Sequence, residues 1–145
     1  MADVRGCNIP DDRHYWVEKH VWVRREGDVA RVGITDVAQN LARKVVAVTA
    51  KKAGKSIKAG KSVATVESGK WVGPVLTPFA GEVAEVNAAL ASDPELVNTD
   101  PYEAGWIVAL KPEDWDRDMA DKPFGGDAVS AYEAFLESEG IECDG

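Results

Sequence analysis

The stretch "TVESGKW", residues 65–71, lies between two apolar runs and has the pattern of a β-hairpin tip. Lys70 follows Val63, Val66 and a Glu-Ser-Gly turn, and Gly73-Pro74 leads into a further apolar run after it. This pattern predicts a strand on each side of a turn that carries Lys70. A lysine at such a tip is usually only a solvated charge, so its meaning depends on the rest of the chain.

Length and composition favour one compact domain with a tail. The chain has 145 residues, of which 45% are hydrophobic, and this is typical of a globular protein. No apolar stretch is long enough to cross a bilayer, and the first residues, "MADVRGCNIPDDRH", contain no apolar signal region. We therefore expect a cytoplasmic monomer that does not contact membranes.

The two cysteines, Cys7 and Cys143, lie near opposite ends of the chain. They have no C-x-x-C spacing and form no zinc set with the two histidines, so no metal site is predicted. We interpret them as reduced, exposed thiols, with a redox-active pair in mobile segments as the alternative. Cys143 lies between Glu142 and Asp144, whereas Arg5 lies close to Cys7, so Cys7 is expected to react faster with alkylating reagents.

Acidity is concentrated in the C-terminal part of the chain. Residues 112–145 contain eleven acidic and two basic residues, in a chain whose net charge is −8. The overall sign argues against nucleic-acid binding. A basic run without any acidic residue lies between Val37 and Val66: Arg43, Lys44, Lys51, Lys52, Lys55, Lys58 and Lys61. We interpret this run as a solvated face, with a docking patch for an acidic partner as the alternative.

Alternation and turn residues predict a core made of strands. In the segment 16–35, Val21 and Val23 alternate with Trp22, and the turn residues that follow predict a hairpin. One or two helical turns fit the next segment, residues 34–45. Short apolar runs broken by Gly and Pro continue to a closing strand, "WIVALK". This pattern of short strands separated by turns favours a small β-sandwich or barrel.

The chain changes character after Lys111. A polar stretch is followed by apolar residues at helical spacing, with Gly140 as a stop signal: Val129, Tyr132, Phe135 and Leu136. We expect a helix laid against the β-core, followed by a free acidic end. The predicted organisation is a flexible segment 1–13, a domain 14–111 and an acidic extension 112–145 with one helix.

Several sequence blocks together resemble the H-protein of the glycine cleavage system, over residues 14–111. The blocks are "HVWV", "GITDVAQ", "VESGK", "PFAGEVAEVN", "LVNTDPYEAGW" and "WIVALK". The resemblance implies an all-β barrel-sandwich hybrid fold with short helical turns and a lipoyl group amide-linked to a lysine. The matching residue is Lys70, and its recognition context would be Glu67, Ser68, Gly69 and Trp71.

The resemblance also implies a carrier rather than an enzyme. The lipoyl arm would move an intermediate between partner enzymes, and its dithiolane would supply thiol–disulfide chemistry. Expected partners are a lipoate ligase or other attaching enzyme, a dihydrolipoamide dehydrogenase and the enzymes that load the arm. Biotin carriers usually place Met on both sides of their lysine, so Gly69 and Trp71 argue against biotin.

Two departures from the family pattern concern the cargo on the arm. Val21 and Pro74 stand where the family pattern has carboxylates that contact a basic aminomethyl group, and each lost contact costs about 1–3 kcal/mol. This favours a second group of H-like proteins, the lipoate-binding proteins of sulfur oxidation, which work with a heterodisulfide-reductase-like complex. The alternatives are a glycine cleavage H-protein carrying an aminomethyl group and an unlipoylated H-like interaction module.

Overall fold

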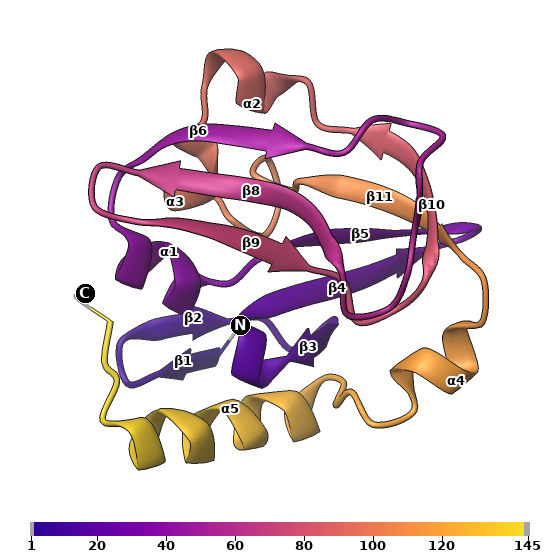
Figure 1. Cartoon of the computed structure of the whole chain (residues 1–145). Coiled ribbons are helices and arrows are strands. Elements are labelled where there is room, and N and C mark those ends of the chain that lie inside the picture. Colours follow the sequence, from indigo (N-terminus) through magenta and orange to yellow (C-terminus); the bar gives the residue numbers. More distant parts are fainter. Residues whose placement is uncertain (1, 144–145) are drawn as a thin grey trace.

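Two antiparallel β-sheets form the main layers of the protein (Figure 1). The structure is a computed structural model and describes residues 2–143. The three-stranded sheet has the order β6-β8-β9, with bounds Val45–Ala50, Ser62–Ser68 and Val72–Leu76. The six-stranded sheet has the order β3-β4-β5-β11-β10-β7, with bounds His14–Trp16, Val21–Glu26, Val29–Ile34, Val108–Pro112, Gly81–Val86 and Ser56–Ile57.

The main hydrophobic core lies between these sheets. Val23 of β4, Val66 of β8 and Leu110 of β11 are nearly or fully buried in one cluster. Val66 alternates with the exposed Thr65 and Glu67, and this places it on the inward face of β8. Both predicted hairpins are confirmed: β4 pairs with β5, and β8 pairs with β9 on either side of Lys70.

The helices are short, except for α5 near the C-terminus. Their bounds are η1 Val17–Lys19, α1 Asp36–Ala42, α2 Ala89–Ser92, α3 Leu96–Thr99, α4 Trp115–Met119 and α5 Gly126–Glu139. The side chain of Thr35 caps α1 by accepting a hydrogen bond of 3.3 Å from the amide of Ala38. α5 ends at Gly140, whose φ of 67° needs the freedom of glycine.

A second core lies on the other side of β4. Trp22 points away from Val21 and Val23 and is buried with Tyr15, Tyr102 and the inner face of α5. The hairpin of β1 (Ala2–Val4) and β2 (Cys7–Ile9) completes this cluster. The predicted helix face is confirmed, because Tyr132 and Leu136 are fully buried there. Two clusters therefore enclose β4, one on each face.

The two ends of the chain are docked and joined, so our interpretation of free thiols and a flexible residue 1–13 segment is wrong. Cys7 is fully buried and forms a disulfide with Cys143, with the Cα atoms 5.0 Å apart. The amide of Cys143 donates to the carbonyl of Arg5 (3.0 Å), and the Arg5 side chain donates to the carbonyl of Ile141 (2.9 Å). Because both cysteines are in the disulfide, the expectation that Cys7 reacts faster than Cys143 is wrong as well.

The acidic extension also differs from expectation. It contains two helices, α4 and α5, rather than one. Its predicted free end is tied down through residue 143, and residues 144–145 lie outside the described part of the chain. The physical reason is that α5 covers apolar side chains of the β1–β2 hairpin, and this brings the segment after α5 alongside β2. Cys7 and Cys143 are 136 residues apart, so no local sequence pattern predicts their pairing.

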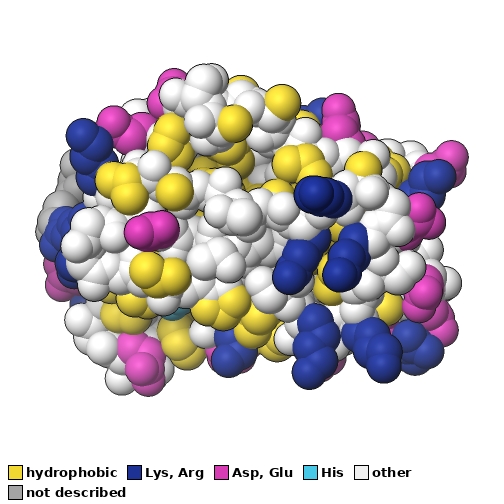
Figure 2. Space-filling view, turned by 45° about the horizontal axis from the view of Figure 1, so that its top comes forward, with side chains coloured by type: hydrophobic (Ala, Val, Ile, Leu, Met, Phe, Trp, Pro, Cys, Tyr) yellow, Lys and Arg dark blue, Asp and Glu magenta, His cyan; other side chains and the backbone are white. Residues whose placement is uncertain are grey.

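Most of the basic run lies in exposed connections. Figure 2 shows Lys and Arg side chains gathered on one part of the face over the three-stranded sheet. The exposed lysines beside β7 are Lys51, Lys52, Lys55, Lys58 and Lys61. They precede β8, whereas Lys70 follows it, so the two features lie at opposite ends of that strand. The acidic-partner interpretation stays a prediction. Among residues 2–143, no helix is long and apolar enough to span a membrane.

The disulfide gives the first testable prediction. The variant Cys7→Ala/Cys143→Ala should unfold with a free energy about 2–4 kcal/mol below that of the oxidised protein, because the bond closes a very long loop in the unfolded chain. Urea unfolding of both proteins measures the difference. In the native oxidised protein, neither cysteine should react with iodoacetamide. Rapid alkylation of either one, read by peptide mapping, would contradict the structure.

Candidate functional site

Lys70 occupies the tip of the β8–β9 hairpin, in a tight and exposed turn. The amide of Ser68 donates to the carbonyl of Trp71 over 2.8 Å and closes the turn. The hydroxyl of Ser68 accepts weakly from the amide of Lys70 at 3.4 Å. Gly69 and Lys70 are both exposed, and a Cβ on Gly69 would meet no atom within 4 Å. The tip therefore leaves room for an enzyme to reach the Lys70 amine.

The other context residues at the tip have different roles. Glu67 is exposed and lies opposite Val72 in the β8–β9 ladder. Trp71 folds back over Gly73, although the residue remains 46% exposed. Its indole ring covers Gly73, where an added Cβ would overlap the ring. A glycine two residues after Trp71 is therefore required by this packing.

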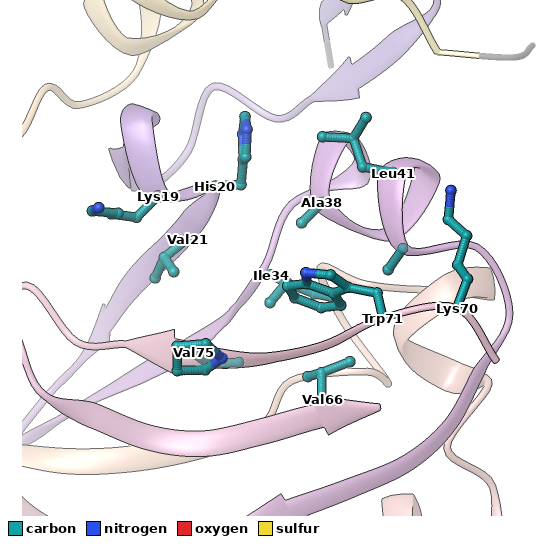
Figure 3. A pocket seen from close by; sticks show the side chains of 12 residues that line it. Lys19, His20, Val21, Ile34, Ala38, Leu41, Val66, Lys70, Trp71 and Val75 are labelled. Carbon is teal, nitrogen blue, oxygen red and sulfur yellow. The ribbon is translucent and has the colours of Figure 1, made fainter. Parts of the chain in front are cut away.

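A cleft of about 440 Å³ opens beside the tip (Figure 3). Its apolar walls come from β4, α1 and the β8–β9 hairpin, and Figure 3 shows Lys70 at the edge beside Leu41 and the Trp71 ring inside, near Ile34. The lining residues are Lys19, His20, Val21, Ile34, Ala38, Leu41, Ala42, Val66, Lys70, Trp71, Pro74 and Val75.

The structure brings both departures from the family pattern into this cleft. Val21 and Pro74 line it together with Lys70, although they lie far apart in the sequence. Among residues 2–143, the side chains that line the cleft include no Asp or Glu, and its charged members are Lys19 and Lys70. The cleft therefore offers an apolar surface and no anionic partner for a cation.

His20 is the one histidine on the cleft wall, and its backbone is held in an unusual conformation. Its φ of 56° lies in the left-handed region, which costs a non-glycine residue roughly 1–2 kcal/mol. The ring Nδ1 lies 2.6 Å from the hydroxyl of Tyr132, and that hydroxyl lies 2.9 Å from the hydroxyl of Thr35. Donation from Thr35 to Tyr132 and on to His20 gives each hydroxyl proton an acceptor and leaves the imidazole proton on Nε2.

Burial keeps this imidazole neutral. Desolvation lowers the pKa of His20 to about 4, and the nearby charge of Glu18 offsets this only in part. The polar contact behind the cleft is thus a hydrogen-bonded chain of neutral groups rather than an ion pair.

Part of this site was missed by sequence reasoning. Ile34, Ala38 and Leu41 were recognised only as parts of a strand and a helix, and their place on the cleft wall follows from how α1 packs beside the hairpin. The link from His20 to Tyr132 spans 112 residues and has no local signal. The apolar face of α5 showed that it would be covered, but not by which residues.

Comparison with known proteins identifies the family. The family model "Glycine cleavage H-protein" matches residues 14–123. The chain belongs to this family. The H protein 5 of the glycine cleavage system of Aquifex aeolicus is 43% identical over 147 residues, which cover 99% of each chain. The glycine cleavage system H protein of Thermus thermophilus is 47% identical over 132 residues, which cover 91% of this chain and 98% of that protein.

The fold is confirmed by a solved structure. The crystal structure of a glycine cleavage system H protein from Mycobacterium marinum matches with a TM-score of 0.73 and 33% identity, over 92% of this chain and all of that one. Proteins of this family carry lipoate covalently on a lysine and act as carriers rather than as catalysts. The names of the relatives support the glycine cleavage alternative and give no support to sulfur oxidation.

The buried imidazole gives the second prediction. The pKa of His20 is about 4 in the folded protein and about 6.5 in the unfolded chain. Between these values the unfolded chain binds the extra proton, so stability falls as the pH drops from about 6.5 to about 4. The loss attributable to His20 should be roughly 2–3 kcal/mol. The variant His20→Asn, which tolerates the left-handed backbone, should lack this component.

Urea unfolding between pH 4 and pH 7 measures the contribution of His20 to the free energy of unfolding. Carboxylates also titrate in this range, so the informative quantity is the difference between the two proteins at each pH. Parallel stability curves for wild type and His20→Asn would show that the imidazole is not held neutral.

Proposed function

We propose that Lys70 carries a lipoyl group and that the chain moves an intermediate between partner enzymes on this arm. The observation that carries the proposal is the position of Lys70, exposed at the hairpin tip, in a chain whose family carries lipoate on a lysine. Ser68 and Trp71 close the turn beneath it, so the amine is presented on a fixed base rather than on a loose loop.

Acylation would suit both the lysine and the cleft beside it. An amide bond removes the positive charge of Lys70 and adds a long apolar arm that ends in a dithiolane. An apolar arm can lie against the cleft walls without leaving a charge unpaired, whereas the free ammonium group cannot. The protein would then serve as a substrate of its partners, which are an attaching enzyme, a dihydrolipoamide dehydrogenase and the enzymes that load and unload the arm.

Glycine cleavage is the first candidate for the process that this carrier serves. It is supported by the names of the relatives and by identity over nearly the whole chain. Its partners would be the glycine cleavage enzymes, and its cargo would be an aminomethyl group.

The cleft favours a second candidate, in which the cargo is uncharged at the arm's end, such as sulfur. The specific observation is that Val21 and Pro74 face the cleft where carboxylates would balance an aminomethyl cation. A role in sulfur oxidation with a heterodisulfide-reductase-like complex belongs here, and it rests on this chemistry alone. An unlipoylated interaction module remains a hypothesis that the next experiment decides.

The third prediction concerns attachment. Incubation with lipoate, ATP and a lipoate ligase should add one lipoyl group, and Lys70→Arg should abolish the addition. Lys61→Arg, which changes an exposed lysine at the other end of β8, should behave like the wild type. Intact-mass analysis and peptide mapping give the result. Failure of the wild type to accept lipoate would favour the interaction module, and modification of Lys70→Arg would place the site elsewhere.

The fourth prediction concerns cargo. In a reconstituted glycine decarboxylase assay, the lipoylated wild type should load the aminomethyl group poorly, and Val21→Glu/Pro74→Asp should raise kcat/KM. Each restored contact is worth about 1–3 kcal/mol, so the two together should give a gain of at least about thirtyfold. Val72→Glu adds a carboxylate to the same hairpin outside the cleft and should give no gain. Wild-type turnover equal to that of an established H-protein would remove the second candidate.

A further inference from the structure

The disulfide between the two ends of the chain lies at the edge of the second core, and its two halves are unequally covered. Cys7 is fully buried, whereas Cys143 is partly exposed and packs against that cluster from outside. A disulfide is broken when a thiolate attacks one sulfur atom and expels the other as a leaving thiolate. This difference in exposure makes Cys143 the sulfur that an incoming thiol can reach, and Cys7 the leaving group.

The leaving sulfur already has a hydrogen-bond acceptor beside it. Sγ of Cys7 lies 3.9 Å from the carbonyl oxygen of Arg5, which can accept a hydrogen bond from a thiol at this position. A neutral cysteine thiol behaves as a small apolar side chain, so reduced Cys7 can stay in the second core. Reduction therefore does not require the β1–β2 hairpin to unfold.

A dithiol is the class of reductant that suits this pair. Its first thiolate forms a bond to Cys143, while Cys7 leaves and takes up a proton. Its second thiol then displaces Cys143, which takes up the second proton, and the dithiol closes into a cyclic disulfide. Two electrons and two protons thus pass from the dithiol to the cysteine pair. A monothiol remains in equilibrium as a mixed disulfide on Cys143, because Cys7 stays beside it and can displace it again.

The disulfide is the covalent tie between the C-terminal segment and the β1–β2 hairpin. Two hydrogen bonds accompany it, from the amide of Cys143 to the carbonyl of Arg5 (3.0 Å) and from the Arg5 side chain to the carbonyl of Ile141 (2.9 Å). Arg5 also forms an ion pair with Glu142 at 3.2 Å, and an exposed ion pair adds little stability. Loss of the covalent bond therefore leaves the end of the chain weakly held.

Strand β2 holds the first turn of α1. The amide of Asn8 donates to the carboxylate of Asp36 over 2.8 Å. The hydroxyl of Tyr102 donates to the carbonyl of Asn8 (2.6 Å) and accepts from the amide of Asp36 (2.9 Å). Asp36 is the first residue of α1, and the same helix supplies Ala38 and Leu41 to the wall of the cleft. A shift of β2 would therefore move this wall.

Helix α5 contacts the same end of α1. The hydroxyl of Tyr132 lies 2.9 Å from the hydroxyl of Thr35, which caps α1, and 2.6 Å from the ring of His20. The disulfide thus joins β2 to the segment that follows α5, and these two elements meet at the start of α1. Both must stay docked if α1 is to keep these contacts.

We propose that Cys7 and Cys143 form a second thiol–disulfide site of this protein, which dithiols reduce at Cys143, and whose oxidised state holds α5 and β2 against the start of α1. Reduction loosens α5 and α1 and leaves the main core intact. The redox state at the two ends of the chain is thereby coupled to the cleft wall beside Lys70. This site is distinct from the proposed lipoyl arm and works without it, so every test uses protein without lipoate.

Thiol exchange on the folded protein tests the site of attack. Oxidised protein is mixed with free dihydrolipoamide, quenched with acid and then alkylated with iodoacetamide in urea. Intact mass should show both cysteines alkylated. Reduced glutathione in place of the dithiol should leave an adduct that peptide mapping finds on Cys143. Exchange that occurs only after the protein is unfolded, or an adduct on Cys7 alone, would overturn the proposal.

Hydrogen exchange, followed residue by residue by NMR, tests the coupling. On reduction, amides of α5 and α1 should become roughly tenfold faster in exchange relative to amides of β8 and β11, because the helices can then open without the main core. Re-oxidation should restore the original pattern. An equal acceleration of all these amides would mean that the bond only stabilises the whole fold, and it would overturn the coupling.

The variant Cys7→Ala/Cys143→Ala is the matched control for the reductant. Its exchange pattern should resemble that of the reduced wild type, and addition of dihydrolipoamide should not change it. A response of this variant to the dithiol would place the effect outside the cysteine pair. If the variant does not fold, wild type measured before and after reduction still decides the question.

Tyr132→Phe separates the hydrogen bonds from the covalent bond. It keeps the disulfide and the apolar packing of the ring, but it removes the hydroxyl between His20 and Thr35. In the oxidised variant, amides of α1 should exchange faster, and the ring resonances of His20 should shift in the same direction as when the wild type is reduced. Resonances of His20 that stay unchanged on reduction of the wild type would show that the cysteine pair is not coupled to the cleft wall.

Discussion

The hydroxyl group of Tyr132 is the contact through which the C-terminal helix supports the cleft. It lies 2.6 Å from the ring of His20 and 2.9 Å from the hydroxyl of Thr35. His20 forms part of one cleft wall, and Thr35 caps the helix that forms another. A phenol that is fully buried must be hydrogen-bonded, so these partners are needed wherever α5 packs in this way. The helix and the cleft therefore depend on each other.

The division into two hydrophobic clusters follows from the same arrangement. β4 sends Val21 and Val23 to one side and Trp22 to the other, and each side is covered by different elements. The main cluster holds the sheets together and positions the hairpin of Lys70. The second joins α5 and the β1–β2 hairpin to the back of the β-core. A strand covered on both faces cannot shift its register without exposing one set of side chains, so the start of β4, where the cleft wall begins, is held firmly.

What could be predicted from the sequence was local or familial. The alternation of Val21 and Val23 with Trp22 and the stop at Gly140 each act within a few residues, and the structure contains both. The blocks around Lys70 gave the family, which the comparison confirmed. Val21 and Pro74 could be placed in one cleft only through the resemblance.

The parts that could not be predicted depend on contacts between distant segments. The Cys7 side chain reads as a surface thiol when its segment is considered alone, and it becomes buried because α5 covers the hairpin that carries it. The position of the Trp71 ring depends on the missing side chain at Gly73, a relation that looks like ordinary turn chemistry in the sequence. Charge counting alone also misses that His20 stands neutral behind the cleft. Each of these features needs the tertiary structure to bring its partners together.

The bond between Cys7 and Cys143 makes the chain a covalent ring over nearly its whole length. Both main sheets lie within that ring, and so does the hairpin that carries Lys70. A tension applied at the two ends would therefore pass through the sulfur–sulfur bond and leave the strand ladders unloaded. For the same reason, a single break in any connection between these cysteines would turn the ring into an open chain without separating it into two pieces. The carrier would remain one molecule, with its lysine still joined to both of its cores.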